Sequence, residues 1–287
     1  MFADISIQDF SADSLSYSAE EIARFREAKT RDFDRAGIKN YLIEGDNLLD
    51  AKAIMNDFFP DVTADVFLSH AHRDEDDVIK LAIKLESLGL KVFVDSCIWG
   101  YADELLKEVD NKFCMNDEKS CYYYEPRNRT TSNVHMILNA ALHNMIAKTE
   151  LLLFLQTKNS LKISNYVTNN VYLSSPWIFS ELTFAKLCER TPRRRLRIDG
   201  MLNYGAEAAD SAIFEDVRKD AQFAHEFPGT QFEITINTFN TWLNESRPLV
   251  SNLSAESEVS ALQHLDQLYV AAGIPLRMLR IPRYARG

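Results

Sequence analysis

Apolar residues along this chain follow two spacings, and the change from one to the other marks the expected strands and helices. Short apolar runs at residues 64–69, 91–95 and 151–155 predict buried strands. Between the first two runs, residues 74–88 carry apolar side chains at helical spacing and predict a helix that ends at Gly89. Strands that alternate with helices over short connections are typical of a parallel sheet.

The same alternation continues beyond the third strand. Further strands are expected at residues 195–198 and 232–236. Five strand–helix units predict a flavodoxin-like, doubly wound α/β fold with five parallel strands in the order 2-1-3-4-5. The remaining helices of this domain are expected at residues 102–113, 132–148, 176–190, 207–227 and 238–243.

The two ends of the chain and one internal segment fall outside this alternation. Residues 1–60 predict a helical extension, whereas residues 247–287 predict a C-terminal helix followed by a basic tail. The α/β domain is therefore expected at residues 61–246, with a polar insertion at 114–131. We expect the extra helices to serve self-association or trigger binding. Removal of residues 1–60 should then alter regulation and leave the α/β core folded.

The composition is that of a globular protein, because hydrophobic residues make up 46% and charged residues 26%. No apolar run approaches the roughly 20 residues that cross a bilayer, and the first residues lack a signal-peptide pattern. The four cysteines are too few for a disulfide scaffold, so a cytoplasmic location is expected. The net charge of −10 argues against a general nucleic-acid binder, and no membrane partner is expected.

Several common sites of doubly wound sheets are excluded by the sequence. The turn at residues 69–74 has no glycine, so the G-x-G-x-x-G motif of dinucleotide-binding sites is absent. The chain also lacks the P-loop motif and the G-x-S-x-G motif of hydrolases. The third strand ends in Gln156 and Thr157, which rules out a phosphate-accepting aspartate there. A site built from side chains remains, and neither a metal ion nor a resident cofactor is expected.

Ligands of such sheets bind beyond the carboxyl ends of the strands, where this chain places several polar and aromatic residues. Ser69 and His70 follow the first expected strand. A loop that begins at Asp95 and includes Trp99 and Tyr101 follows the second. These residues are the candidate contacts of a substrate.

The stretch at residues 175–182 opens the helix that follows the third strand. Ser175 is a favourable N-cap, and Pro176 suits the first helical position. Trp177 and Glu181 are four residues apart and therefore share one helical face. An aromatic plane beside a carboxylate suits a ligand with a flat ring and a cationic or hydroxyl-rich part. Taken alone, the pattern is more often structural, because such a Trp packs in the core and such a Glu interacts with the helix dipole.

Three segments, Asp65–His70, Leu88–Asp95 and Ser175–Leu182, together resemble motifs of the TIR domain, the fold of Toll/interleukin-1 receptors. The resemblance covers residues 62–245 in the order of the family. It is closest to bacterial TIR proteins of antiphage defence, including those of Thoeris systems. In NAD⁺-cleaving TIR domains a glutamate on the third helix is catalytic, and by motif position this residue is Glu181.

The resemblance also implies a pocket and partners. Trp177 matches an aromatic residue of the NAD⁺ pocket, and the loop from Asp95 to Tyr101 would border that pocket. NAD⁺ is then the substrate, and its nicotinamide–ribose bond is cleaved to give ADP-ribose or a cyclic isomer. The family further implies self-association through the TIR domain and a separate effector that responds to the product.

Two other functions remain open at this stage. A non-enzymatic TIR interaction module would assemble through its loops and would not require a carboxylate on the third helix. A nucleoside deoxyribosyltransferase-like enzyme shares this type of sheet and cleaves an N-glycosidic bond through a covalent carboxylate. A trapped glycosyl-enzyme would distinguish the second alternative from a TIR enzyme.

Overall fold

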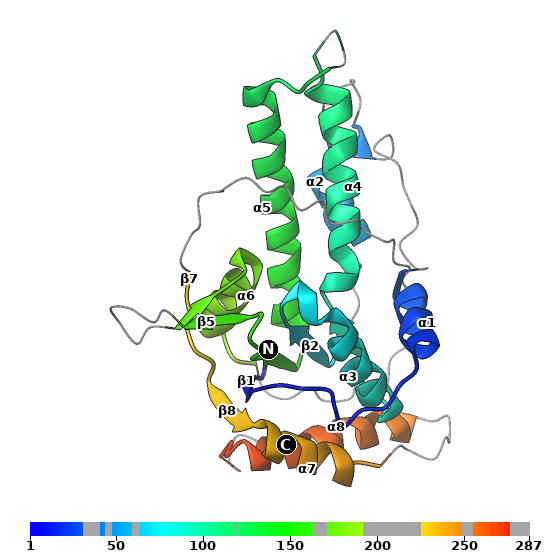
Figure 1. The fold of residues 1–287 in the computed structure, drawn as a ribbon, viewed down its shortest axis with the longest axis vertical. Coiled ribbons are helices and arrows are strands. Elements are labelled where there is room, and N and C mark those ends of the chain that lie inside the picture. The colour runs from blue at the N-terminus through cyan, green and yellow to red at the C-terminus, as the bar shows by residue number, and fades with distance from the viewer. Residues whose placement is uncertain are drawn as a thin grey trace, which may run out of the picture.

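The computed structural model describes residues 1–30, 41–43, 48–58, 64–116, 118, 120–163, 171–191, 225–247 and 255–275. These residues form an α/β fold around a five-stranded, all-parallel sheet with the strand order β3-β2-β4-β1-β8 (Figure 1). The arrangement is compatible with the expected flavodoxin-like fold. The strands are β1 (Ala3–Gln8), β2 (Val66–Ser69), β3 (Val92–Val94), β4 (Leu151–Leu155) and β8 (Phe232–Thr235).

Helices cover both faces of this sheet, and a small antiparallel sheet lies beside it. The helices are α1 (Ala19–Thr30), α2 (Ala51–Phe58), α3 (Glu75–Ser87), α4 (Ser96–Phe113), α5 (Tyr124–Lys148), α6 (Pro176–Leu187), α7 (Ile236–Glu245) and α8 (Ala255–Ala271), with a 3₁₀ turn η2 (His72–Asp74). The antiparallel strands are β5 (Leu161–Ile163), β6 (Val171–Leu173) and β7 (His225–Glu226). Among the described residues, no helix is both long and apolar enough to cross a membrane.

The strand β1 was not expected from the sequence. The pattern predicts only helices before residue 60, and this prediction is wrong for residues 3–8, which pair with β4 on one side and with β8 on the other. In the described part of the chain, β1 therefore fills the place between the third and fifth strands of the expected order. The boundary at residue 60 stays a prediction, but removal of residues 1–60 would take an interior strand out of the sheet.

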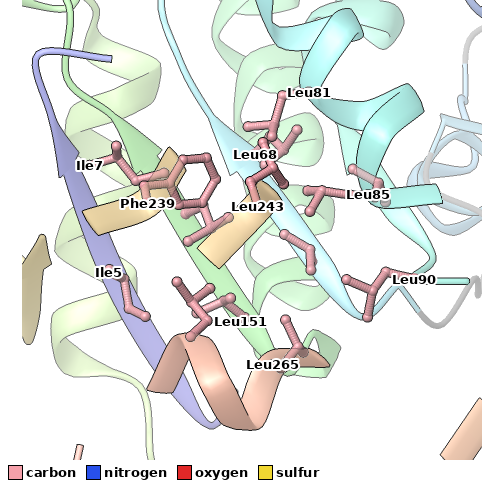
Figure 2. Packing of buried hydrophobic residues seen from close by; sticks show 14 of the residues in the cluster. Ile5, Ile7, Leu68, Leu81, Leu85, Leu90, Leu151, Phe239, Leu243 and Leu265 are labelled. Carbon is pink, nitrogen blue, oxygen red and sulfur yellow. The ribbon is translucent and has the colours of Figure 1, made fainter. Parts of the chain in front are cut away.

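The hydrophobic core has two halves, one on each face of the sheet. One half joins β1, β2, β3 and β4 to α3, α7 and α8, and Figure 2 shows its packed side chains, among them Ile5, Leu68 and Leu265. The other half joins the opposite sides of β2 and β4 to α2, α4, α5 and α6. Because both of its faces are covered, β4 is a continuous apolar run of five buried residues.

The helices α4 and α5 both begin earlier than the sequence pattern predicts. They lie side by side as two long helices that project from the sheet (Figure 1), and Met115 pairs with Tyr122 in the turn between them. The expected insertion at 114–131 is therefore mostly the first part of α5. Polar residues fill that part because it is exposed, so the apolar stripe that identifies a helix is missing there.

Most other expected elements are confirmed with shifts of a few residues at their ends. The strands at 91–95, 151–155 and 232–236 and the helix at 176–190 correspond to β3, β4, β8 and α6. The expected strand at 195–198 and the expected helix up to residue 224 lie outside the described residues. Near the expected end of that helix at residue 227, residues 225 and 226 instead form β7.

Candidate functional site

Glu181 lies in the middle of α6, and local sequence fixes how this helix begins. The Ser175 side chain accepts a hydrogen bond from the backbone N–H of Trp177 at 3.2 Å, and Pro176 occupies the first helical position. The expected helix start is thus confirmed. The apolar neighbours Ile178, Leu182 and Ala185 pack against the sheet, and they place Glu181 at its carboxyl edge.

The Glu181 carboxyl group meets side chains from the ends of two strands. Ser69, the last residue of β2, donates a hydrogen bond from Oγ to Glu181 Oε2 at 2.5 Å. The carboxyl group of Asp95, which directly follows β3, lies within hydrogen-bonding reach of the Glu181 carboxyl group. The structure therefore brings three of the expected site residues together at adjoining strand ends.

His70 adds a fourth side chain on the far side of Asp95. Its Nδ1 lies 3.2 Å from Asp95 Oδ1 and 3.0 Å from the backbone oxygen of Leu68. Its Nε2 is buried and has no hydrogen-bond partner among the described residues. We name Ser69, Glu181, Asp95 and His70 the carboxyl cluster, because they form a continuous row of polar contacts around two carboxyl groups.

The carboxyl cluster is closed from solvent. Glu181 is 0% exposed, and the other three members are at most 5% exposed. Burial raises the pKa of Glu181 well above its usual range, and the neighbouring Asp95 carboxyl raises this pKa further. The hydrogen bond from Ser69 acts in the opposite direction, because a donor favours the ionised carboxylate. The balance favours a neutral Glu181 in the closed site.

Asp95 occupies the N-cap position of α4, but its side chain does not cap that helix. The segment after β3 therefore begins α4, and the prediction of a loop from Asp95 to Tyr101 is wrong. The helix was missed in the sequence because Gly100 and the aromatic residues conceal the helical spacing of this segment. In the first turn of α4, burial raises the pKa of the Cys97 thiol to about 12. Cys97 is therefore a thiol at neutral pH and not a nucleophile.

The expected aromatic contacts are not all placed near Glu181. The half-buried ring of Trp177 packs edge-on against His135 of α5, with 5.6 Å between ring centroids. Trp99 and Tyr101 lie within α4, but their side chains are outside the described residues. Only the polar members of the expected site are therefore shown to cluster.

A second polar group at the same sheet edge was missed from the sequence. Asp74, at the N-cap position of α3, accepts hydrogen bonds from Thr157 Oγ1 and Asn159 Nδ2, both at 2.5 Å. It ties the turn after β2 to the turn after β4. The N-cap position was visible in the sequence, but a capping aspartate is expected to bond its own helix and not a distant turn.

The chain matches no family model, no curated protein and no solved structure.

Proposed function

We propose that the chain is a TIR-type enzyme that cleaves the nicotinamide–ribose bond of NAD⁺, with Glu181 as the catalytic residue. The observation that carries this proposal is the position of Glu181 at the carboxyl ends of β2 and β3, in contact with Ser69 and beside Asp95. The crevice beyond the strand ends is where doubly wound sheets bind their ligands.

The chemistry requires few groups from the protein. The glycosidic electron pair leaves with nicotinamide, which departs as a neutral molecule and needs no general acid. The ribose then carries positive charge at C1′, and an ionised Glu181 beside it would oppose that charge. Water attacks C1′ and loses one proton to give ADP-ribose, or a nucleophile of the ADP-ribosyl group attacks to give a cyclic isomer.

The proposal includes an opening step. Because Glu181 has no exposed surface, a ribose reaches it only after the side chains over it move. Asp95 is the first candidate to move, because it lies at the junction of β3 and α4 and its side chain does not hold the start of α4 by capping. Self-association or a trigger that opens this junction would then switch on the enzyme, with a separate effector responding to the product.

An NAD⁺ consumption assay with separation of products tests the proposal. The wild type, Glu181→Ala and the surface control Glu189→Gln are compared as pure proteins and after addition of phage-infected cell extract. We expect nicotinamide release from the wild type and the control, and its loss in Glu181→Ala. The second product distinguishes a hydrolase from a cyclase. Equal release from Glu181→Ala and the wild type would refute the assignment.

The complete burial of Glu181 also favours a second candidate, a TIR interaction module without enzymatic activity. In such a module the carboxyl cluster would only join β2, β3 and α6. Absence of nicotinamide release under both conditions, together with self-association of the wild type in solution, would support this candidate.

A further inference from the structure

The inward face of α1 is half apolar and half cationic. Its buried or half-buried side chains follow the spacing of one helical face, namely Ile22, Phe25, Arg26 and Lys29. The other side chains described in α1 are exposed. Because only two apolar side chains face inward, apolar burial by itself holds this helix weakly, and the two cations contribute the rest of its attachment.

Both cationic side chains form ion pairs with α3. Arg26 donates from Nε to Glu75 Oε1 at 3.0 Å and from Nη2 to Asp76 Oδ1 at 2.7 Å. Lys29 donates from Nζ to Glu86 Oε1 at 2.5 Å. Glu75 and Asp76 begin α3 and Glu86 lies near its end, so the ion pairs attach α1 to both ends of that helix.

The start of α4 lies at the same contact. α1 contacts α4 as well as α3, and it lies beside both in Figure 1. Phe25 packs against the half of the core that contains Cys97, in the first turn of α4. Arg26 and Lys29 are close enough to act electrostatically on the Cys97 thiol. Because Asp95 is two residues from Cys97, α1 covers the segment that carries one member of the carboxyl cluster.

We infer that α1 is a releasable clasp, fastened by Arg26 and Lys29, that holds the start of α4 in its closed position. Release of α1 uncovers Cys97 and allows the segment after β3 to move. Control of catalysis by this clasp rests on the proposed function, whereas the release itself can be measured without turnover.

The exposure of the ion pairs makes α1 releasable. The side chains of the Arg26–Glu75 and Lys29–Glu86 pairs are between 20% and 33% exposed, so water and salt ions screen their attraction. A helix of 12 residues is also too short to remain helical by itself in water, so α1 unfolds when it leaves α3. A rise in ionic strength should therefore shift α1 towards the released state.

Thiol labelling of the purified full chain, resolved by peptide mass spectrometry, measures the release at Cys97. Burial raises the pKa of this thiol to about 12, so it reacts only when its surroundings open. Cys114 is the internal control, because it is also buried but lies about 25 Å away at the other end of α4. The exposed Cys121 gives the labelling rate of an open thiol.

Replacement of both cations removes the fastening. When Arg26→Gln and Lys29→Gln are combined, Cys97 should label about 10-fold faster than in the wild type, because three partly exposed ion pairs are lost. Cys114 should label at its wild-type rate. The matched control is Arg24→Gln, because Arg24 is exposed on the same helix and pairs within α1 itself. Both thiols should label in this control as they do in the wild type.

An exchange of charges separates the ion pair from the packing of the lysine. Lys29→Glu alone should accelerate labelling of Cys97, and the addition of Glu86→Lys should restore the slow rate by forming the pair with opposite polarity. In the wild type, about 0.5 M salt should also accelerate labelling of Cys97 relative to Cys121. If the double glutamine variant does not fold, the salt series and the charge exchange make the same test.

Each outcome bears on one of the two proposals. Equal labelling of Cys97 in the double glutamine variant and in Arg24→Gln would overturn the inference. Equal acceleration of Cys97 and Cys114 would also overturn it, because the ion pairs would then stabilise the whole fold and not a local clasp. If the wild type cleaves NAD⁺, the double variant should release nicotinamide faster without a trigger. Faster labelling of Cys97 with no nicotinamide release from any of these proteins would count against the proposed function and leave the clasp supported.

Discussion

Two buried carboxyl groups in this chain have opposite surroundings. Asp110, near the end of α4, is 2% exposed and accepts hydrogen bonds from Arg127 Nε at 3.0 Å and from Thr130 Oγ1 at 2.9 Å. Glu181 is 0% exposed, receives one hydrogen bond from a neutral hydroxyl, and lies beside another carboxyl group. Both carboxyl groups are buried, but within the part of the chain that the structure describes only Asp110 lies beside a cationic side chain.

These different surroundings indicate that Asp110 has a structural role, whereas Glu181 is a candidate for a role in catalysis. Asp110 fixes the start of α5 against the end of α4, since both of its donors belong to the first turns of α5. Among the described residues no cationic side chain is shown to compensate Glu181 in this way, so its burial costs stability or favours its neutral form. A costly buried group without a structural partner is a candidate for function.

The largest expected effect is the loss of enzymatic activity when Glu181 is replaced. We expect Glu181→Gln to lower nicotinamide release by at least about 10²-fold, because the amide cannot oppose the charge on the ribose. The midpoint of urea unfolding at pH 7 should not fall, since the amide has the shape of the neutral acid and can donate to Asp95. A large loss of stability would instead assign Glu181 a structural role.

The next largest effect is the loss of stability when Asp110 is replaced. Asp110→Ala removes the acceptor of Arg127 Nε and one of the two acceptors of the Thr130 hydroxyl, which also donates to the Arg127 backbone oxygen. It should lower the free energy of unfolding by about 1–3 kcal/mol. Urea unfolding measures this change, with the exposed Asp103→Ala as the control on the same helix. NAD⁺ turnover per folded molecule should stay at the wild-type level. The comparison between the two sites fails if Asp110→Ala is no less stable than Asp103→Ala.

A smaller effect concerns the dependence of stability on pH. Because the folded-state pKa of Glu181 is raised, the folded protein binds more protons than the unfolded chain above the ordinary value of 4.5. The stability of the wild type relative to Glu181→Gln should therefore decrease as pH rises from 4.5 towards the raised pKa. The slope should not exceed about 1.4 kcal/mol per pH unit. Parallel stability curves for the two proteins would contradict a raised pKa.

The smallest effect is expected at the exposed partner of Asp110. The Arg127 side chain is 54% exposed, so its ion pair is largely screened by water. Arg127→Gln should lower the free energy of unfolding by less than about 1 kcal/mol, because the amide can still donate to Asp110. A double-mutant cycle with Asp110→Asn measures the pair alone. A coupling energy as large as the loss of stability in Asp110→Ala would show that the positive charge of Arg127, and not the hydrogen bonds, stabilises the contact between the end of α4 and the start of α5.

The sequence predicted the sheet well where strands are continuous apolar runs, as in β4. It failed for β1, where Asp4 and Ser6 interrupt the apolar residues and resemble a surface pattern. Both are buried, and partners far along the chain satisfy them, namely the backbone N–H of Gln231 for Asp4 and Thr230 Oγ1 for Ser6. Such partners cannot be identified from local spacing.

Four polar residues of the candidate site were expected to lie near one another, but their burial was not, and the roles of the site residues stay predictions. Ser69, His70, Asp95 and Glu181 were expected from their positions after strands and on the third helix, and they do lie together. Their burial was not expected, because carboxyl groups are rarely removed from water without a cation. The contact between Glu181 and Asp95 joins residues from separate segments, and only the folded chain establishes it.

The position of β1 also bears on how the protein folds during synthesis. β1 is made before both of its neighbours, since β4 and β8 follow much later in the chain. Its backbone groups and the apolar residues Ile5 and Ile7 therefore have no sheet partner until β4 has left the ribosome, and they lack the second partner until β8 follows. Such long-range pairing slows folding and exposes an unpaired strand to association with other chains. This interior strand of the finished sheet is thus the segment that most needs protection while the chain is incomplete.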